Sequence, residues 1–175
     1  RLLRKMENHV ILCGYGRVGQ EISNQIKTQN IPIIVVESDE DRKKIAEENG
    51  LEVLCADATL DETLKLAGLE KCKSLVVTLP NDAANLYVVL SAKGIRSSIR
   101  VIARAGTEEA ASKLRLAGAS IVVSPYIAAG RAMASMALRP IAIDFLDLLA
   151  GSECEIEEFE LSNDISLFET AEKRS

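Results

Sequence analysis

Short apolar runs alternate along the chain with stretches in which apolar residues recur every three or four positions. Such runs, rich in Val, Ile and Leu, are typical of parallel strands that are covered on both faces of a sheet. The stretch with Val18, Ile22 and Ile26 has the four-residue spacing of a helix. The predicted strands are NHVILCG, IPIIVVE, LEVLCA, KSLVVTL, RVIARA and SIVVSP, beginning at residues 8, 31, 51, 73, 100 and 120.

Capping residues predict where the intervening helices begin and end. The second helix is expected to begin at a capping Ser38 and to stop at Gly50. Further helices are expected near residues 60–67, 81–93 and 106–117, with Gly118 closing the last of them. Strict alternation of strand and helix predicts an α/β fold, a Rossmann-like doubly wound parallel sheet of six strands in the order 3-2-1-4-5-6.

The segment after the sixth strand, residues 124–151, is apolar nearly all round and rich in small residues. A helix of this composition cannot bury every side against one sheet face, so we predict a crossover helix that associates with a second subunit. A self-contained terminal helix pair is the alternative. Pro140 is expected to end or kink the helix, a second helix to follow through Ile141, Phe145 and Leu148, and ECEIEEFEL to open a second lobe.

These patterns divide the chain into three parts. Residues 1–8 form a basic lead-in, residues 9–138 the Rossmann-like lobe, and residues 139–175 the interface helix and the beginning of a second lobe.

Charge and composition exclude several classes of protein. The net charge is −5, and residues 151–175 contribute eight acids and only two bases, so no basic face for nucleic acid is expected. Four scattered cysteines and one histidine lack the spacing of a metal site, and we predict none. Cys13 and Cys55 are expected to be buried, reduced thiols. No apolar run is long enough to cross a membrane, and no signal peptide is recognisable.

Three glycines between the first strand and the first helix carry the main functional signal. Gly14, Gly16 and Gly19 form G-x-G-x-x-G inside a βαβ unit whose second strand ends in Glu37. Gly14 would make the tight turn, Gly16 would let the backbone approach a pyrophosphate, and Gly19 would let helix and strand pack closely. Glu37 would accept hydrogen bonds from ribose hydroxyls and repel a 2′-phosphate, which favours NAD or an adenine nucleotide over NADP. The alternative is that the glycines serve packing alone.

Other strand ends should meet the same crevice, because ligands of open α/β sheets bind at the carboxyl ends of the strands. Asp57 could accept from an adenine amino group, or it could be an ordinary turn aspartate. Thr78 follows the fourth strand, and beside it Asn81 or Asp82 could simply cap the next helix.

Two arginines are candidates for phosphate binding. Arg104 ends the otherwise apolar fifth strand, where a charge needs an anionic partner, and we predict a phosphate. Arg17 lies inside the glycine turn and could reach the same phosphates or remain in solvent.

Catalytic groups are missing from the expected positions. His9 precedes the first strand, at the wrong end of the sheet for proton transfer, and too few residues follow position 140 for a catalytic domain. We therefore predict a binding module with no catalytic residues, and a truncated NAD-dependent oxidoreductase is the alternative.

The chain resembles the RCK domains, which regulate potassium conductance and also occur as nucleotide-binding subunits of potassium uptake systems. The resemblance rests on HVILCGYGRVG, VVESD, ADAT, LPNDAAN, VIARA and LRLAGASIVVSP, and it spans residues 9–161. RLLRKMEN also resembles the linker that follows the inner helix of a channel pore. The resemblance implies a ligand-gated potassium channel or uptake system, with the domain at the cytoplasmic face of the membrane and the pore in the same chain or in another one.

The resemblance also implies a gating ring and a set of ligand contacts. The helix after Pro125 would cross to a partner subunit, and the dimers would form an octameric ring. NAD(H), ADP, ATP or AMP would be the regulatory ligand. Calcium-gated relatives use a carboxylate after the fifth strand, where this chain has Arg104, so that calcium site is in doubt. The candidate nucleotide-binding residues are Gly14, Tyr15, Gly16, Arg17, Gly19, Glu37, Asp57, Ala58, Thr78 and Arg104.

Overall fold

The computed structural model describes residues 6–138 of the chain. The helix predicted after Pro140, the acidic strand and most of the basic lead-in lie outside the described residues. Contacts divide the chain into two units, residues 1–131 and 132–175. The first unit holds all six described strands of the sheet.

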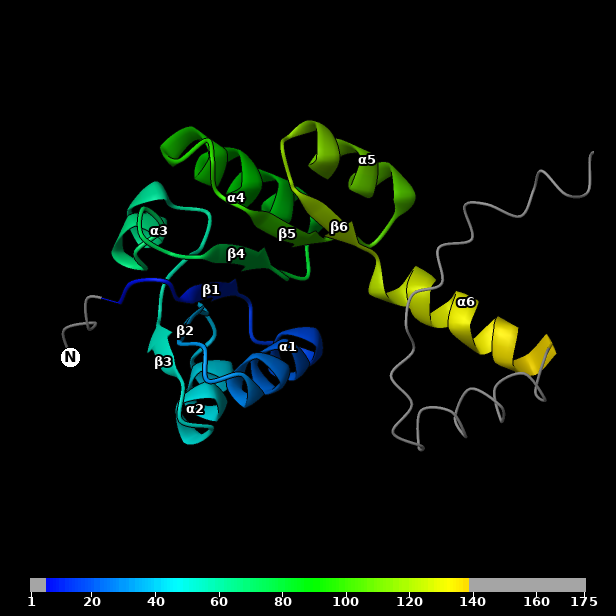
Figure 1. Cartoon of the computed structure of the whole chain (residues 1–175), viewed down its shortest axis with the longest axis horizontal. Helices are drawn as coiled ribbons and strands as arrows, with labels where there is room; N and C mark the ends of the chain where they lie inside the picture. Colours follow the sequence, from blue (N-terminus) through cyan, green and yellow to red (C-terminus); the bar gives the residue numbers. More distant parts are fainter. Residues whose placement is uncertain (1–5, 139–175) are drawn as a thin grey trace, which may run out of the picture. The chain divides into compact units, whose positions relative to one another are not determined.

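Within residues 6–138, six strands alternate with six helices, as the sequence predicts (Figure 1). The strands are β1 (Val10–Cys13), β2 (Ile33–Val36), β3 (Glu52–Leu54), β4 (Ser74–Val77), β5 (Val101–Arg104) and β6 (Ile121–Val123). The helices are α1 (Arg17–Thr28), α2 (Glu40–Glu48), α3 (Asp61–Leu66), α4 (Asp82–Ile95), α5 (Glu108–Leu116) and α6 (Pro125–Leu138). All strand pairs are parallel and their order is β3-β2-β1-β4-β5-β6, which confirms the predicted Rossmann-like topology.

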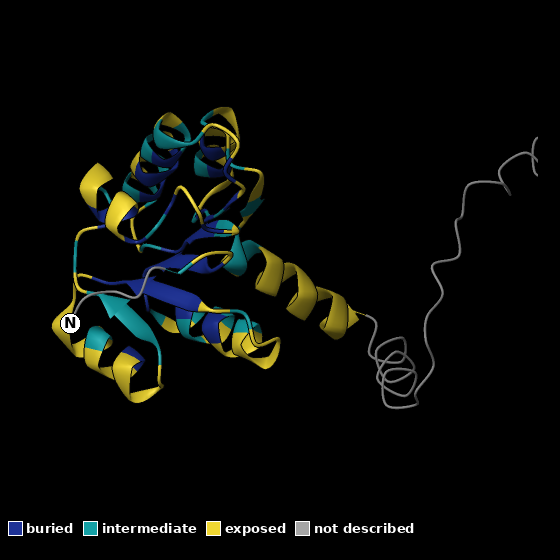
Figure 2. Cartoon of the chain, turned by 60° about the vertical axis from the view of Figure 1, so that its left-hand side comes forward, coloured by how far each residue is buried: buried dark blue, intermediate teal, exposed yellow. Residues whose placement is uncertain are grey.

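The central strands are apolar because helices cover both of their faces. Every residue of β1 and β2 is buried (Figure 2). On one face, Ile22 and Ile26 of α1 and Ala46 of α2 pack against the sheet. On the other, Leu64 of α3, residues of α4 and Leu114 of α5 complete a larger cluster. The topology reverses between β2-β1 and β1-β4, which places the glycine loop after β1 at the switch point of the sheet.

Two local predictions near α2 and β3 are wrong. The N-cap of α2 is Asp39, not Ser38, because the Asp39 carboxylate accepts hydrogen bonds from the N–H groups of Asp41 and Arg42. Cys55 is exposed, since β3 ends at Leu54 and the chain leaves the sheet there. Cys13, by contrast, is fully buried as predicted, and burial raises the pKa of its thiol to about 12.

Candidate functional site

The packing of the chain itself requires two of the three glycines in the loop after β1. Gly14 has a φ of +94°, and a Cβ there would lie 3.0 Å from the backbone oxygen of Thr78. A Cβ on Gly19 would lie 2.3 Å from the backbone oxygen of Gly14, so α1 can approach the end of β1 only when this residue has no side chain. Both glycines therefore have a structural role, as their spacing predicts.

Gly16 has no such requirement. Its φ of −74° and ψ of −168° suit any residue, and a Cβ there would meet no atom within 4 Å. It is the N-cap of α1, no side chain caps that helix, and the first turn contains no acidic residue. The first amides of a helix lack intrahelical acceptors and carry positive partial charge, so this end of α1 suits an anion.

Glu37, just beyond β2, is fixed beside the glycine loop. Its side chain is buried, and one carboxylate oxygen accepts the N–H of Tyr15 at 2.7 Å while the other accepts the N–H of Asp39 at 3.0 Å. A carboxylate has about four lone-pair sites, so these two bonds leave acceptor capacity for two further donors. The N–H of Tyr15 in the glycine loop and the N–H of Asp39 before α2 therefore fix the orientation of this carboxylate.

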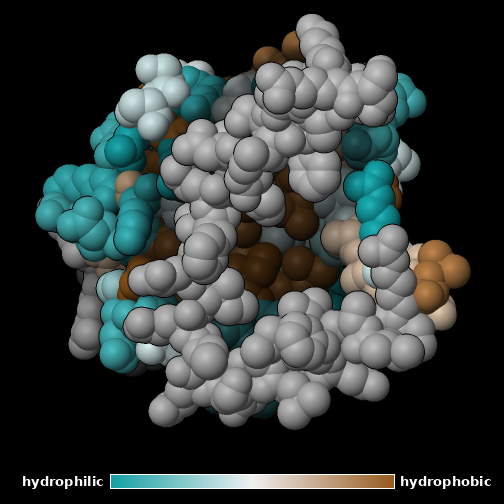
Figure 3. Space-filling model, turned by 45° about the vertical axis from the view of Figure 1, so that its right-hand side comes forward, coloured by the Kyte–Doolittle hydropathy of each residue, from teal (hydrophilic) through white to brown (hydrophobic). Residues whose placement is uncertain are grey.

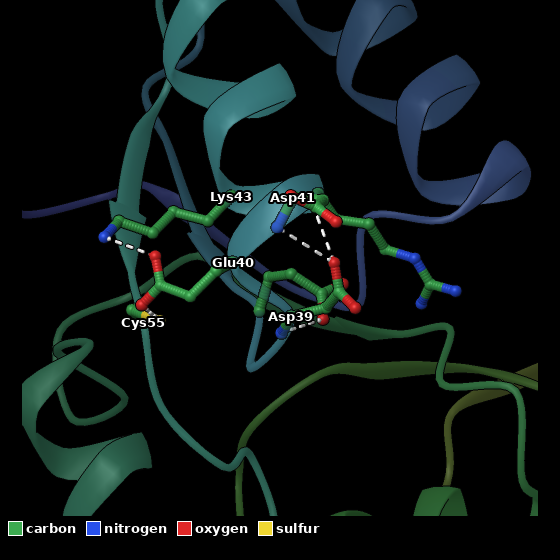
Figure 4. A network of polar contacts seen from close by, with 7 residues as sticks. Asp39, Glu40, Asp41, Lys43 and Cys55 are labelled. Carbon is green, nitrogen blue, oxygen red and sulfur yellow. Dashed lines mark hydrogen bonds and ion pairs between the residues drawn. The ribbon is translucent and has the colours of Figure 1, made fainter.

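A polar network lies at the rim next to Glu37 (Figure 4). Glu40 accepts hydrogen bonds from the Cys55 thiol at 3.2 Å and from the Lys43 ammonium at 3.0 Å. The bond from Cys55, and then the one from Lys43, lowers the pKa of the Glu40 carboxyl. The hydrogen bond between Cys55 and Glu40 raises the pKa of the Cys55 thiol, so this exposed sulfur is held in its protonated form.

Asp57 and Ala58 lie beyond the end of β3. One Asp57 oxygen accepts both the N–H of Thr59 at 2.9 Å and its hydroxyl at 2.7 Å, which is the turn geometry of the alternative interpretation. Asp57 is exposed, whereas the Ala58 side chain is buried in the core. The turn is therefore observed, and a contact of Asp57 with adenine stays a prediction.

Thr78 and the residues after it hold the switch point together. The buried Thr78 hydroxyl lies 3.1 Å from the carbonyl oxygens of Cys13 and Gly14, to which it can donate. Asn81 caps α4 by accepting the N–H of Ala84 at 3.0 Å, in agreement with the capping interpretation. Asp82 accepts the N–H of Gly106 at 2.8 Å and so links the loops after β4 and β5.

Asn85 is a structural residue of the site that the sequence reasoning missed. It is fully buried, and its side chain accepts the N–H of Leu79 and donates to the carbonyls of Leu79 and Arg104. The available signal was an amide within the otherwise apolar run ANLYVVL, at a position that faces the strands. Its bonds fix the backbone at the carboxyl ends of β4 and β5.

The arginines and Tyr15 differ in what they present to the crevice. Arg17, the first residue of α1, is exposed, and Arg104, the last residue of β5, is half-buried. The Tyr15 side chain is fully buried, and its hydroxyl accepts a hydrogen bond from the Asn49 amide at 3.1 Å. The side chain of Tyr15 therefore packs inside the protein, and its backbone N–H bonds to Glu37.

His9 lies at the opposite end of β1 and serves the fold. Its ring is fully buried and donates from Nε2 to the carbonyl of Ala67 at 2.7 Å. A Cβ on Gly68 would lie 2.9 Å from this ring, so the turn after α3 packs tightly against it. The position agrees with the expectation that His9 lies far from the crevice.

The side chains and helices of residues 6–138 bear on metal binding and on membrane insertion. Within this part of the chain, no three His, Cys, Asp or Glu side chains gather as a metal site would need. None of the described helices combines the length and the apolar character needed to cross a membrane.

The chain is similar to proteins of one family. The family model of the TrkA-N domain matches residues 10–125. Potassium channel protein 1 of Methanocaldococcus jannaschii is 38% identical over 157 residues, which are 89% of this chain and 47% of that protein. The chain spans about half the length of the curated relatives it matches.

Solved structures show the same fold. The TrkA-N domain of the inner membrane protein ybaL from Escherichia coli superposes with a TM-score of 0.71 at 31% identity, covering 75% of this chain and 97% of that one. The structure of GsuK bound to ADP superposes with a TM-score of 0.66 at 29% identity, covering 74% of this chain and 34% of that one.

Proposed function

The chain belongs to the TrkA-N domain family, and from that premise we propose that it is a regulatory domain that binds NAD or an adenine nucleotide and controls potassium flux. The resemblance to RCK domains that the sequence indicates is confirmed by the potassium channel relatives and by the GsuK structures. The ligand acts in this proposal through different affinities for two states of an assembly, and it is not consumed.

One observation carries the nucleotide site, namely the open space around Gly16. Packing explains Gly14 and Gly19, but neither the backbone angles nor any neighbour explains a glycine at position 16. A phosphate group that approaches the amides at the start of α1 would need that space. Arg17 at the start of the helix and Arg104 at the end of β5 would supply positive charge to the phosphates.

Glu37 supports an adenosine ribose over a 2′-phosphorylated one. Its buried carboxylate, fixed by two backbone N–H groups, can accept from ribose hydroxyls but would repel a 2′-phosphate. The relative GsuK, whose structure is described as bound to ADP, makes an adenine nucleotide a consistent ligand.

Titration calorimetry of the purified chain tests this function. We expect ADP or NAD to bind, and NADP to bind at least about tenfold more weakly, because its phosphate would face the buried Glu37 carboxylate. Equal affinity for NAD and NADP would contradict the role of Glu37. A parallel incubation with NAD and small alcohols or hydroxy acids should produce no NADH, and steady production would favour the oxidoreductase alternative.

We further propose that α6 joins two copies of the chain and that the dimers build a ring beside a potassium pore. None of the described residues of α6 is buried, and Met133 and Met136 are 70% and 52% exposed. In the space-filling view, brown, apolar residues are visible on the face of the molecule that is shown (Figure 3). A helix so apolar and so exposed is typical of an interface. The pore would be part of the same protein or of a partner, and the domain would lie at the cytoplasmic face of the membrane.

Charged residues on α6 should prevent association. Met133 and Met136 share a helix face at i, i+3 spacing, so the double variant Met133→Glu, Met136→Glu places two carboxylates in the proposed interface. We expect the variant to sediment as a monomer under conditions in which the native chain is a dimer. Leu66→Glu, at an equally exposed apolar residue of α3, is the matched control. A dimeric double variant would place the interface elsewhere.

A further inference from the structure

We propose that Tyr126, in the first turn of α6, positions Arg104 for the phosphate of the bound nucleotide and thereby couples nucleotide binding to α6. This inference rests on the proposed function, since it assigns Arg104 to the ligand. Tyr126 lies outside the glycine loop and the strand ends assigned to the nucleotide, on the helix proposed to join two copies of the chain.

The contact between the two side chains is a cation–π interaction. The guanidinium carbon of Arg104 lies 5.4 Å from the centroid of the Tyr126 ring, within the range of about 6 Å for such contacts. The attraction is to the face of the ring and uses none of the five N–H donors of the guanidinium. Within residues 6–138, no ion pair involves Arg104. The Tyr126 ring can thus hold the guanidinium of Arg104 while the N–H donors of the guanidinium stay available to an anion.

The backbone on both sides of this contact is fixed. The Arg104 carbonyl accepts from the Asn85 amide at 3.1 Å, and the N–H of Ala105 donates to the carbonyl of Val123 at 2.9 Å. Arg104 pairs directly with Val123 of β6, three residues before Tyr126. The strand ends therefore set where the Arg104 side chain begins, and the ring of Tyr126 sets where its charged end lies.

Core packing does not account for the position of Tyr126. Tyr126 is the second residue of α6, directly after Pro125, and it is 61% exposed. The N–H of Ala128 donates to the carbonyl of Ser124 at 2.9 Å, so the turn of α6 that carries Tyr126 is hydrogen-bonded as a helix. A phosphate bound to Arg104 would favour the arrangement in which Arg104 contacts Tyr126, and hence one orientation of this turn. Because coupling is reciprocal, the state of α6 would change nucleotide affinity by the same factor.

Affinities for ADP and for adenosine test the inference. Tyr126→Leu removes the aromatic face and should weaken ADP binding by about 3- to 30-fold, the range of one cation–π contact. Adenosine, which has no phosphate, should bind the variant as it binds the native chain. Tyr126→Phe keeps the face and is the matched control, with ADP affinity expected within about twofold of native. In an Arg104→Gln background, Tyr126→Leu should have no further effect, as a double-mutant cycle measures directly.

The coupling to α6 has its own readout. The dimer dissociation constant from sedimentation should shift on addition of ADP in the native chain and in Tyr126→Phe, and should not shift in Tyr126→Leu or Arg104→Gln. Native ADP affinity in Tyr126→Leu, or equal losses for ADP and adenosine, would overturn the inference and leave the proposed function intact. A native chain that binds neither ADP nor NAD would overturn both.

Discussion

Gly16→Ala is expected to weaken ADP binding by at least about tenfold while changing the free energy of unfolding by less than about 1 kcal/mol. The added methyl group meets no atom of the chain within 4 Å, and the backbone angles at this residue suit alanine. The methyl group would instead occupy the space over the start of α1 that a phosphate needs to reach the helix amides. Calorimetry with ADP and denaturant unfolding measure the two quantities separately.

Gly19→Ala is the matched control, with the opposite expectation for stability. Its methyl group would lie 2.3 Å from the Gly14 carbonyl oxygen, which is backbone and cannot rotate away. Overpacking of this kind costs about 1–3 kcal/mol, so the midpoint of unfolding should fall clearly. Native ADP affinity in Gly16→Ala would mean that phosphate does not approach this loop, and native stability in Gly19→Ala would mean that α1 can move away from β1.

The topology could be predicted because its causes are local. Strands β1 and β2 are apolar at every position, as only strands with helices on both faces are, and the alternation with helices permits few chain paths. The glycine motif could be interpreted for the same reason. Gly14, Gly19 and Glu37 lie within one βαβ unit, so their spacing alone brings them together, and the Glu37 bond to the Tyr15 N–H confirms that they meet.

The details that sequence reasoning missed depend on partners far away in the chain. Asn85 also bonds to Leu79 nearby, but it was missed because the partner that joins it to β5, the Arg104 carbonyl, is 19 residues further along the chain. The exposure of Cys55 depends on where β3 stops pairing with β2, which composition does not reveal. The contact of Arg104 with Tyr126 depends on how β6 delivers the chain to α6.

Thr78 has a structural role that its place in the sequence does not reveal. The sequence predicts Thr78 at a nucleotide crevice because it follows β4, and in the structure its buried hydroxyl lies within hydrogen-bonding distance of the carbonyls of Cys13 and Gly14. Thr78 therefore supports the backbone of the glycine loop where the loop leaves β1. A strand end can be predicted from sequence. The hydrogen-bond partner of a hydroxyl can be predicted only when the position of the neighbouring strand is known.

Glu37→Arg should weaken the binding of ADP and NAD by about a hundredfold or more. The substitution removes a carboxylate that would accept ribose hydroxyls through two charge-assisted hydrogen bonds, each contributing about 1.5–3 kcal/mol. It also removes the acceptor for the N–H groups of Tyr15 and Asp39, at 2.7 and 3.0 Å, so the glycine loop loses one of its two hydrogen bonds to the end of β2 and keeps the one from the Gly14 N–H to the Val36 carbonyl. A positive charge at this position should raise the affinity for NADP relative to NAD, which calorimetry with both ligands measures.

Glu40→Arg makes the same change of charge three residues away and is the control for long-range electrostatics. Glu40 is exposed, and it accepts hydrogen bonds from Lys43 and Cys55, whereas Glu37 accepts the N–H of Tyr15 in the glycine loop. We expect this variant to bind ADP within about threefold of the native chain, because exposed charges are screened over short distances. Equal losses in the two variants would assign the effect to net charge. A loss confined to Glu37→Arg, together with a reversed preference between NAD and NADP, would locate the adenosine ribose at the end of β2.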